Sequence, residues 1–168
     1  MPPNADREQR SVLIAYDGSD QAKGAIAEAG RVLGAGRRAV VLTVRDQIEH
    51  YDFTGLGGAT TLDPVTVSAM QDAAQNEATA IAEEGAALAR EAGFAAEAQV
   101  GVAPSPWQEI VDVAEQLDAD LIAIGSRGRT GLSKVLLGSV ASAVAQHSGR
   151  SVLIVHPETA SGDGAGGR

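Results

Sequence analysis

Short apolar runs alternate with amphipathic stretches along most of this chain. Four runs, at residues 11–16, 39–44, 121–124 and 151–155, have the length and the unbroken apolar character of β-strands buried on both faces. A fifth segment, residues 95–100, alternates weakly between apolar and polar positions and is also predicted as a strand. The pattern therefore predicts five strands, most of them covered on both sides.

Between the strands, apolar residues recur every three or four positions, which is the spacing of one face of a helix. The predicted helices span residues 21–33, 67–92, 106–117 and 139–147. Ser105 and Pro106 open the third helix as N-cap and first helical residue, and Gln108 is predicted to complete a capping box. Trp107, at the same helix start, is expected to serve packing.

Residues 45–66 have no clean period, and their glycines together with Pro64 predict an irregular loop. Loops of about 20 residues are unusual in compact domains, where they are often functional or mobile. We therefore expect this segment to shape the entrance to any site at this end of the sheet.

Strands and helices alternate in the order β-α-β-α-β-α-β-α-β, which predicts a parallel sheet with helices on both faces and right-handed crossovers. In such sheets, ligands bind beyond the carboxyl ends of the strands, where the strand order reverses. Asp17, Val44 and Gly125 each lie at the end of a predicted strand. The topology is therefore expected to bring them to one crevice.

A glycine set follows the fourth strand and leads into the last helix: Gly125-x2-Gly128-x9-Gly138-Ser139. Glycines in this position let backbone N–H groups approach an anion, and the helix N-terminus adds unpaired N–H groups and a positive dipole end. Ser139 would add a hydroxyl. The alternative interpretation is that these glycines only form turns. Neither a Walker A pattern nor a GxGxxG fingerprint is present.

Charged residues near these strand ends have two interpretations each. The Asp17 carboxylate could accept a hydrogen bond from an adenine amino group or a ribose hydroxyl, or it could cap the turn before Gly18. Arg127, Arg129 and Lys134 could pair with phosphate oxygens or lie in solvent. Residue type and spacing leave these alternatives open.

A chain of 168 residues suggests one domain that is large enough for a substantial core. Aromatic residues make up only 3% of the chain, so the core is expected to consist of Val, Leu, Ile and Ala. Residues 1–10 and 158–168 are small and polar and are predicted to be a disordered lead-in and tail. The remaining residues, 11–157, form the predicted domain.

Charge and residue usage exclude several classes of function. The net charge of −9 disfavours nucleic acid as a partner, and the lack of cysteine excludes disulfides and thiol catalysis. No apolar run reaches the roughly 18 residues of a membrane span, and no hydrophobic leader is visible, so a cytoplasmic protein is expected. The dispersed His50, His147 and His156 argue against a metal site.

Two motifs together resemble the universal stress protein (UspA-like) family. The first is VLIAYDGS at residues 12–19, and the second combines GSRGRTG at residues 125–131 with LGSV at residues 137–140. The similarity extends over roughly residues 10–157. It implies an open, five-stranded parallel sheet in the order 3-2-1-4-5, a Rossmann-like α/β fold of the adenine nucleotide alpha hydrolase type.

The intact glycine motif places the chain in the ATP-binding branch of that family, with ATP accompanied by Mg²⁺ as the implied ligand. By position, Ala15, Asp17 and Val44 would border adenine and ribose. The residues that would hold ribose and phosphates are Gly125, Gly128, Gly138, Ser139 and Val140. Arg127 is added to the candidate site as a possible partner of phosphate oxygens. The family also implies a homodimer through residues 151–155. A histidine is common in the family where Thr43 and Arg127 stand, so contacts there are expected to differ.

Three functions remain open at this stage. The first is an ATP-binding regulatory module in the stress response, whose nucleotide state is presented to an unknown protein partner. The second is a slow ATPase or phosphotransferase using the same site, against which stands the lack of a positioned base and of magnesium carboxylates other than Asp17. The third is an interaction protein that ignores nucleotides.

Overall fold

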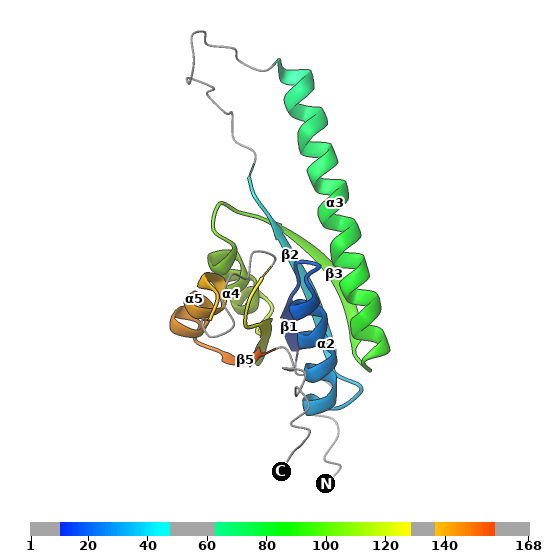
Figure 1. Ribbon diagram of the computed structural model, residues 1–168, viewed down its shortest axis with the longest axis vertical. Coiled ribbons are helices and arrows are strands. Elements are labelled where there is room, and N and C mark those ends of the chain that lie inside the picture. Colours follow the sequence, from blue (N-terminus) through cyan, green and yellow to red (C-terminus); the bar gives the residue numbers. More distant parts are fainter. Residues whose placement is uncertain (1–10, 48–62, 129–136, 157–168) are drawn as a thin grey trace, which may run out of the picture.

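The computed structural model describes residues 11–47, 63–128 and 137–156, which form a parallel sheet with helices on both faces (Figure 1). The predicted ends, 1–10 and 158–168, and most of the predicted loop 45–66 lie outside the described residues. The strands are β1 (Ser11–Ala15), β2 (Arg38–Arg45), β3 (Ala95–Val102), β4 (Leu121–Gly125) and β5 (Ser151–Val155). The helices are α2 (Asp20–Leu33), α3 (Pro64–Glu91), α4 (Pro106–Gln116) and α5 (Ser139–His147).

The strand order is β3-β2-β1-β4-β5, which confirms the prediction. All four neighbouring pairs are parallel, and Val12 of β1 is in register with Ala39 of β2 and with Leu121 of β4. After β1 the chain adds β2 and then β3 along one edge of β1. It then crosses back and adds β4 and β5 along the other edge of β1. The strand order therefore reverses next to β1, and a crevice opens between the carboxyl ends of β1 and β4.

Alternating side chains of β1 point into two separate cores. Val12 and Ile14 belong to the core under α2 and α3, whereas Leu13 belongs to the core under α4 and α5. Figure 1 shows the two helix pairs on opposite sides of the sheet. Because β1 is buried on both faces, it consists of a continuous apolar run rather than an alternating one.

Helix α3 begins earlier than predicted, which makes the predicted loop 45–66 wrong at its carboxyl end. The Asp63 side chain accepts hydrogen bonds from the backbone N–H groups of Val65 and Thr66, each at 3.0 Å. Pro64 occupies the first helical position, where its missing N–H is not needed. A proline that suggested a loop is therefore the first residue of a helix.

The predicted start of α4 is correct, but its capping box is wrong. Ser105 is the N-cap, yet its side chain makes no capping hydrogen bond. Its backbone lies at φ −130° and ψ 101°, whereas Ser19, which does cap α2, lies at φ −72° and ψ 156°. The Ser105 carbonyl takes part in the helix instead, because it accepts a hydrogen bond from the Glu109 N–H at 3.3 Å.

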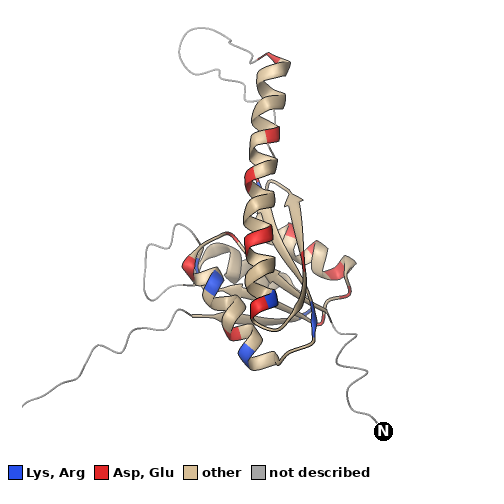
Figure 2. Ribbon diagram, turned by 90° about the vertical axis from the view of Figure 1, so that its right-hand side faces the viewer, with Lys and Arg blue, Asp and Glu red and all other residues tan. Residues whose placement is uncertain are grey.

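The first half of α3 extends beyond the sheet (Figure 1), and acidic residues follow one another along the helix (Figure 2). Glu77, Glu83 and Glu84 are all exposed, as expected for a solvated helix face. None of the helices in the described part of the chain is long and apolar enough to cross a membrane.

The second half of α3 packs closely on the sheet at Gly85, which is buried. A Cβ atom at this position would lie 2.6 Å from Cδ1 of Tyr16 and 2.8 Å from Cγ1 of Val41. Neither atom is the free end of a flexible side chain, so a methyl group would push the helix away from the sheet. Gly24 in α2 is the opposite case, because a Cβ atom there would meet no atom within 4 Å.

These two helical glycines generate a matched prediction. Gly85→Ala is expected to lower the free energy of unfolding by about 1–3 kcal/mol through overpacking. Gly24→Ala is expected to raise it by up to about 1 kcal/mol, because alanine is the better helix former. Urea denaturation followed by circular dichroism measures both. Equal effects of the two substitutions would contradict the close packing of α3 on Tyr16.

Candidate functional site

A cavity of about 430 Å³ lies at the carboxyl ends of β1, β2 and β4, on the side of the sheet covered by α4 and α5. The structure brings all nine residues of the predicted site to its wall. These are Ala15, Asp17, Val44, Gly125, Arg127, Gly128, Gly138, Ser139 and Val140. Segments that are more than 100 residues apart in the sequence thus meet at the place that the topology predicts.

One part of the cavity wall is apolar, and sequence reasoning missed most of it. Leu42, Ile110 and Ile124 line this part together with Ala15 and Val44. Their apolar character predicted core positions, and all three do belong to the core under α4 and α5. Only the tertiary structure shows that the same side chains also border the cavity. A volume of this size and an apolar wall with few polar groups are typical of small-molecule sites.

The three glycines of the motif lie where other parts of the chain approach the backbone closely, and none has the backbone angles that demand glycine. None of them has a positive φ, unlike Gly18 at +80°. A Cβ atom on Gly128 would lie 2.9 Å from Oδ2 of Asp17, and one on Gly125 would lie 3.1 Å from the Gln21 carbonyl oxygen. At Gly138 it would lie 3.3 Å from the Ser126 carbonyl oxygen. These contacts are with protein atoms, so they leave both interpretations of the glycines open.

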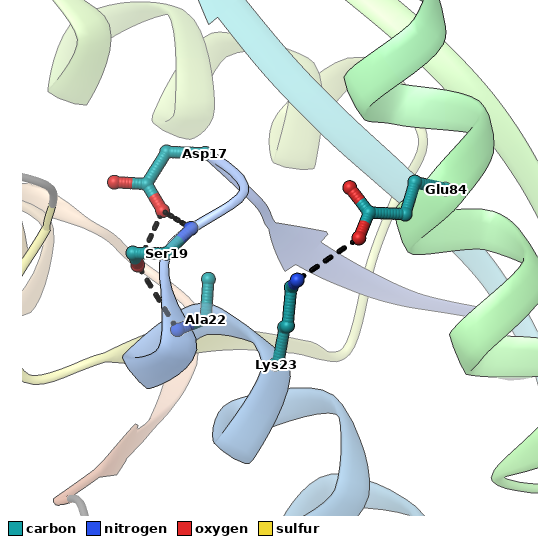
Figure 3. Close-up of polar contacts among 5 residues, drawn as sticks. All are labelled: Asp17, Ser19, Ala22, Lys23 and Glu84. Atoms are coloured by element: carbon teal, nitrogen blue, oxygen red, sulfur yellow. Dashed lines mark hydrogen bonds and ion pairs between the residues drawn. The ribbon is translucent and has the colours of Figure 1, made fainter.

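The Asp17 carboxylate makes the turn interaction considered for it and also lies at the cavity wall (Figure 3). Its Oδ1 accepts hydrogen bonds from the Ser19 backbone N–H at 3.0 Å and from the Ser19 hydroxyl at 2.6 Å. The Ser19 Oγ in turn accepts from the Ala22 N–H at 3.2 Å, which caps α2. Oδ1 thus closes the turn, and Oδ2 lies near Gly128 at the cavity wall.

The N-terminus of α5 forms the polar part of the wall. Gly138 is the N-cap, and its N–H donates to the Ser126 carbonyl at 2.8 Å, which ties the helix start to the end of β4. Ser139 and Val140 are the first helical residues, and both line the cavity. Unpaired N–H groups of a first turn favour an anion. Arg127 lines the same region.

The sequence also singled out two further cations near the site and Thr43, which stands where the family often has a histidine. Arg129 and Lys134 lie outside the described residues. Thr43 is buried, and its hydroxyl donates to the Tyr16 carbonyl at 2.9 Å, while the Tyr16 N–H donates to the Leu42 carbonyl at the same distance. Thr43 therefore holds the end of β1 in place and is not among the residues that line the cavity.

The cavity wall offers few side chains that could hold a metal ion. Within residues 11–47, 63–128 and 137–156, no group of three or more His, Asp or Glu side chains is placed to hold a metal ion. Asp17 is the carboxylate among the lining residues. A magnesium ion, which typically uses one or two carboxylates, water and substrate phosphates, would fit here only together with a phosphorylated ligand.

Comparisons with known proteins agree with this architecture. The model of the universal stress protein family matches residues 9–156. Universal stress protein YxiE of Bacillus subtilis is 31% identical over 154 residues, which cover 86% of this chain and 97% of YxiE. Universal stress protein MJ0531 of Methanocaldococcus jannaschii is 50% identical over a shorter stretch of 50 residues, which spans 30% of this chain and 29% of MJ0531.

Solved structures share the fold. The structure of MJ0577 from Methanocaldococcus jannaschii superimposes with a TM-score of 0.71 and 26% identity, covering 90% of this chain and 98% of that one. A universal stress protein solved in complex with cAMP gives a TM-score of 0.60 and 27% identity, covering 88% of this chain and 96% of that one. The Rossmann-like α/β fold expected from the sequence is thereby confirmed.

The Tyr16 phenol, directly before Asp17, yields a prediction about pH. Its hydroxyl is buried without a hydrogen-bond partner among the described residues, and burial together with the nearby Glu84 carboxylate raises its pKa from 10.0 to about 12. Tyr51 is the other tyrosine of the chain. In a Tyr51→Phe background, phenolate absorbance is therefore expected to appear near pH 12 rather than near pH 10.

The same shift makes stability depend on pH. The folded state holds the Tyr16 proton more tightly than the unfolded state, so this contribution to stability is complete below pH 10 and is lost as pH rises through about 12. Tyr16→Phe serves as the control, because it removes this loss. A phenol that titrates near pH 10 while the chain stays folded would contradict the burial of the Tyr16 hydroxyl.

Proposed function

This chain belongs to the universal stress protein family, and from this premise we propose that its cavity binds ATP and makes the chain a nucleotide-dependent regulatory module in the stress response. The observation that carries the proposal is the cavity wall itself. It combines an apolar part made by the strands and α4 with a polar part made by the glycine motif, Asp17 and the start of α5.

The apolar part suits a flat, uncharged base. Leu42, Ile110 and Ile124 offer aliphatic surface for an adenine ring, and backbone groups at the strand ends are the nearest partners for its edge. The relative solved with cAMP supports an adenine nucleotide as the ligand class. Asp17 is proposed to accept a hydrogen bond from the ribose or the adenine amino group.

The polar part suits phosphates. The glycines let backbone approach the ligand without a Cβ in between, and the first turn of α5 adds N–H groups at its positive end. Arg127 supplies a cation, and Ser139 supplies a hydroxyl. Mg²⁺ is proposed to enter with the triphosphate, held by phosphate oxygens and water, with Asp17 as the candidate protein carboxylate.

A regulatory role fits this wall better than rapid catalysis. Phosphoryl transfer needs a positioned base or water-orienting group and metal-held phosphates, and among the described lining residues Asp17 is the only candidate for either task. We therefore propose that ATP stays bound long enough for its presence to be sensed by a protein partner in the cytoplasm. Slow hydrolysis at the same site is the second candidate, favoured by the carboxylate beside Gly128.

We also propose that the protein forms a homodimer through β5. This strand is last in the sheet order, so among the described residues its outer edge has no strand partner. Such an edge is a template for pairing with a second copy. Light scattering that yields the mass of one chain at micromolar concentration would exclude this arrangement.

Thermal unfolding with ATP and magnesium tests the nucleotide site. ATP at 100 times its dissociation constant should stabilise the chain by about 2.7 kcal/mol, which is on the order of 5–10 °C in Tm. Gly138→Val is expected to abolish the shift, because its side chain would press on the backbone of Ser126 and Arg127 and displace this part of the cavity wall. AMP, cAMP and GTP in parallel show which base and phosphates are recognised.

Gly149→Val is the matched control for that experiment. Gly149 lies outside the cavity, and a Cβ atom there would meet no atom within 4 Å. This variant should keep the full shift with ATP. If Gly138→Val retains the shift, or if no nucleotide shifts the native chain, the assignment of the cavity to nucleotides is wrong.

Release of phosphate distinguishes the two candidate functions. We expect the purified chain to bind ATP with no turnover above that of Gly138→Val measured in parallel. A magnesium-dependent release that Asp17→Asn abolishes, while ATP still shifts the Tm of that variant, would instead establish the slow ATPase. A malachite-green assay over hours, with nucleotide bound at saturation, makes the comparison.

A further inference from the structure

A second hollow, of about 410 Å³, lies on the outer side of α4, next to the end of α5. It shares no lining residue with the first cavity. Its wall consists of Ala103, Pro104, Trp107, Gln108, Glu109, Val111, Asp112 and His147. The proposed nucleotide site does not explain this combination of two aromatic rings and two carboxylates.

The aromatic part of the hollow is a stacked pair. The rings of Trp107 and His147 lie with their centroids 4.8 Å apart and their planes at 29°. Trp107 is held in place because it follows Pro106 at the start of α4 and packs against the core between α4 and α5. Sequence reasoning assigned Trp107 to packing, which the structure confirms, but packing leaves part of this residue at the wall of the hollow.

The charged part of the hollow consists of two carboxylates, and no described lysine or arginine pairs with them. Glu109 and Asp112 stand three residues apart on α4, so they share one helix face. Neither forms an ion pair within the described residues, and no lysine or arginine lines the hollow. The Glu109 carboxylate lies over Gly101 of β3, where a Cβ atom would come within 2.7 Å of its Oε1. The Glu109 carboxylate therefore occupies the space that a side chain at position 101 would need.

We propose that this hollow binds the guanidinium group of an arginine side chain from a protein partner. Aromatic rings attract a cation over their faces, and carboxylates form charge-assisted hydrogen bonds with it. Arginine fits better than lysine because its planar group can stack on a ring and donate two parallel hydrogen bonds to one carboxylate. The chain's net charge of −9 favours a basic partner.

The apolar residues of the wall support a protein partner as the source of the arginine. Ala103, Pro104 and Val111 provide surface for the residues that flank it in a polypeptide. The hollow also lies on α4 and α5, the two helices whose other sides line the first cavity. Because the two cavities share no lining residue, the arginine site can be tested without nucleotide, and its failure would not bear on the proposed nucleotide site.

The test uses the full chain without nucleotide and the peptide acetyl-Ala-Arg-Ala amide. Trp107 is the only tryptophan of the chain, so its fluorescence reports on the hollow directly. A saturable change in fluorescence is expected with this peptide and not with the peptide in which citrulline, the uncharged analogue, replaces arginine. Added salt should weaken the binding. The lysine peptide should bind more weakly than the arginine peptide.

Paired substitutions separate the site from overall charge. Glu109→Gln with Asp112→Asn removes both carboxylates and is expected to weaken binding at least about tenfold. The control pair is Glu83→Gln with Glu91→Gln. It changes the net charge by the same amount at two exposed positions of α3 and should leave binding unchanged. An equal response to the citrulline or lysine peptide, no response to the arginine peptide, or unchanged binding by the first pair would overturn the proposal.

Discussion

The structure depends on one constraint, the parallel pairing of β1 between β2 and β4. Because all three strands run in the same direction, their carboxyl ends lie at one edge of the sheet, where the strand order reverses. Everything that lines the first cavity follows from this placement. Asp17 continues from β1, Val44 lies near the end of β2, and the glycine motif begins at the end of β4.

Close approach of backbone segments is the second determinant. With few aromatic residues, the chain fills the space under its helices with alanines and places glycines where two segments nearly touch. Gly85 brings α3 onto Tyr16, and Gly128 brings the loop after β4 to the Asp17 carboxylate. Such contacts make the core sensitive to single methyl groups, because protein interiors are close-packed. The same tight packing positions the junction between Tyr16 and Asp17 beside the cavity.

Two cavities on neighbouring faces of α4 differ in the chemistry of their walls. The first joins aliphatic side chains to backbone N–H groups and suits an uncharged base with phosphates. The second joins aromatic rings to carboxylates and suits a cation. Ile110 faces the first cavity and Val111 the second, since neighbouring residues on a helix point about 100° apart. A regulatory protein that binds a nucleotide and a partner would need two such sites within reach of each other.

Strand and helix periods predicted the elements, because these periods are local signals. Strand ends and glycine spacing pointed to seven of the nine candidate-site residues, and the family resemblance supplied the sheet order together with Ala15 and Val140. The sequence misplaced the start of α3 and proposed a capping box at Ser105 that the structure does not form. Only the tertiary structure decided that Leu42, Ile110 and Ile124 face a cavity, and that Trp107 meets His147. It also showed that Gly128 lies close to the distant Asp17 carboxylate and has no positive φ of its own. These facts depend on contacts between residues far apart in the chain, which no local pattern records.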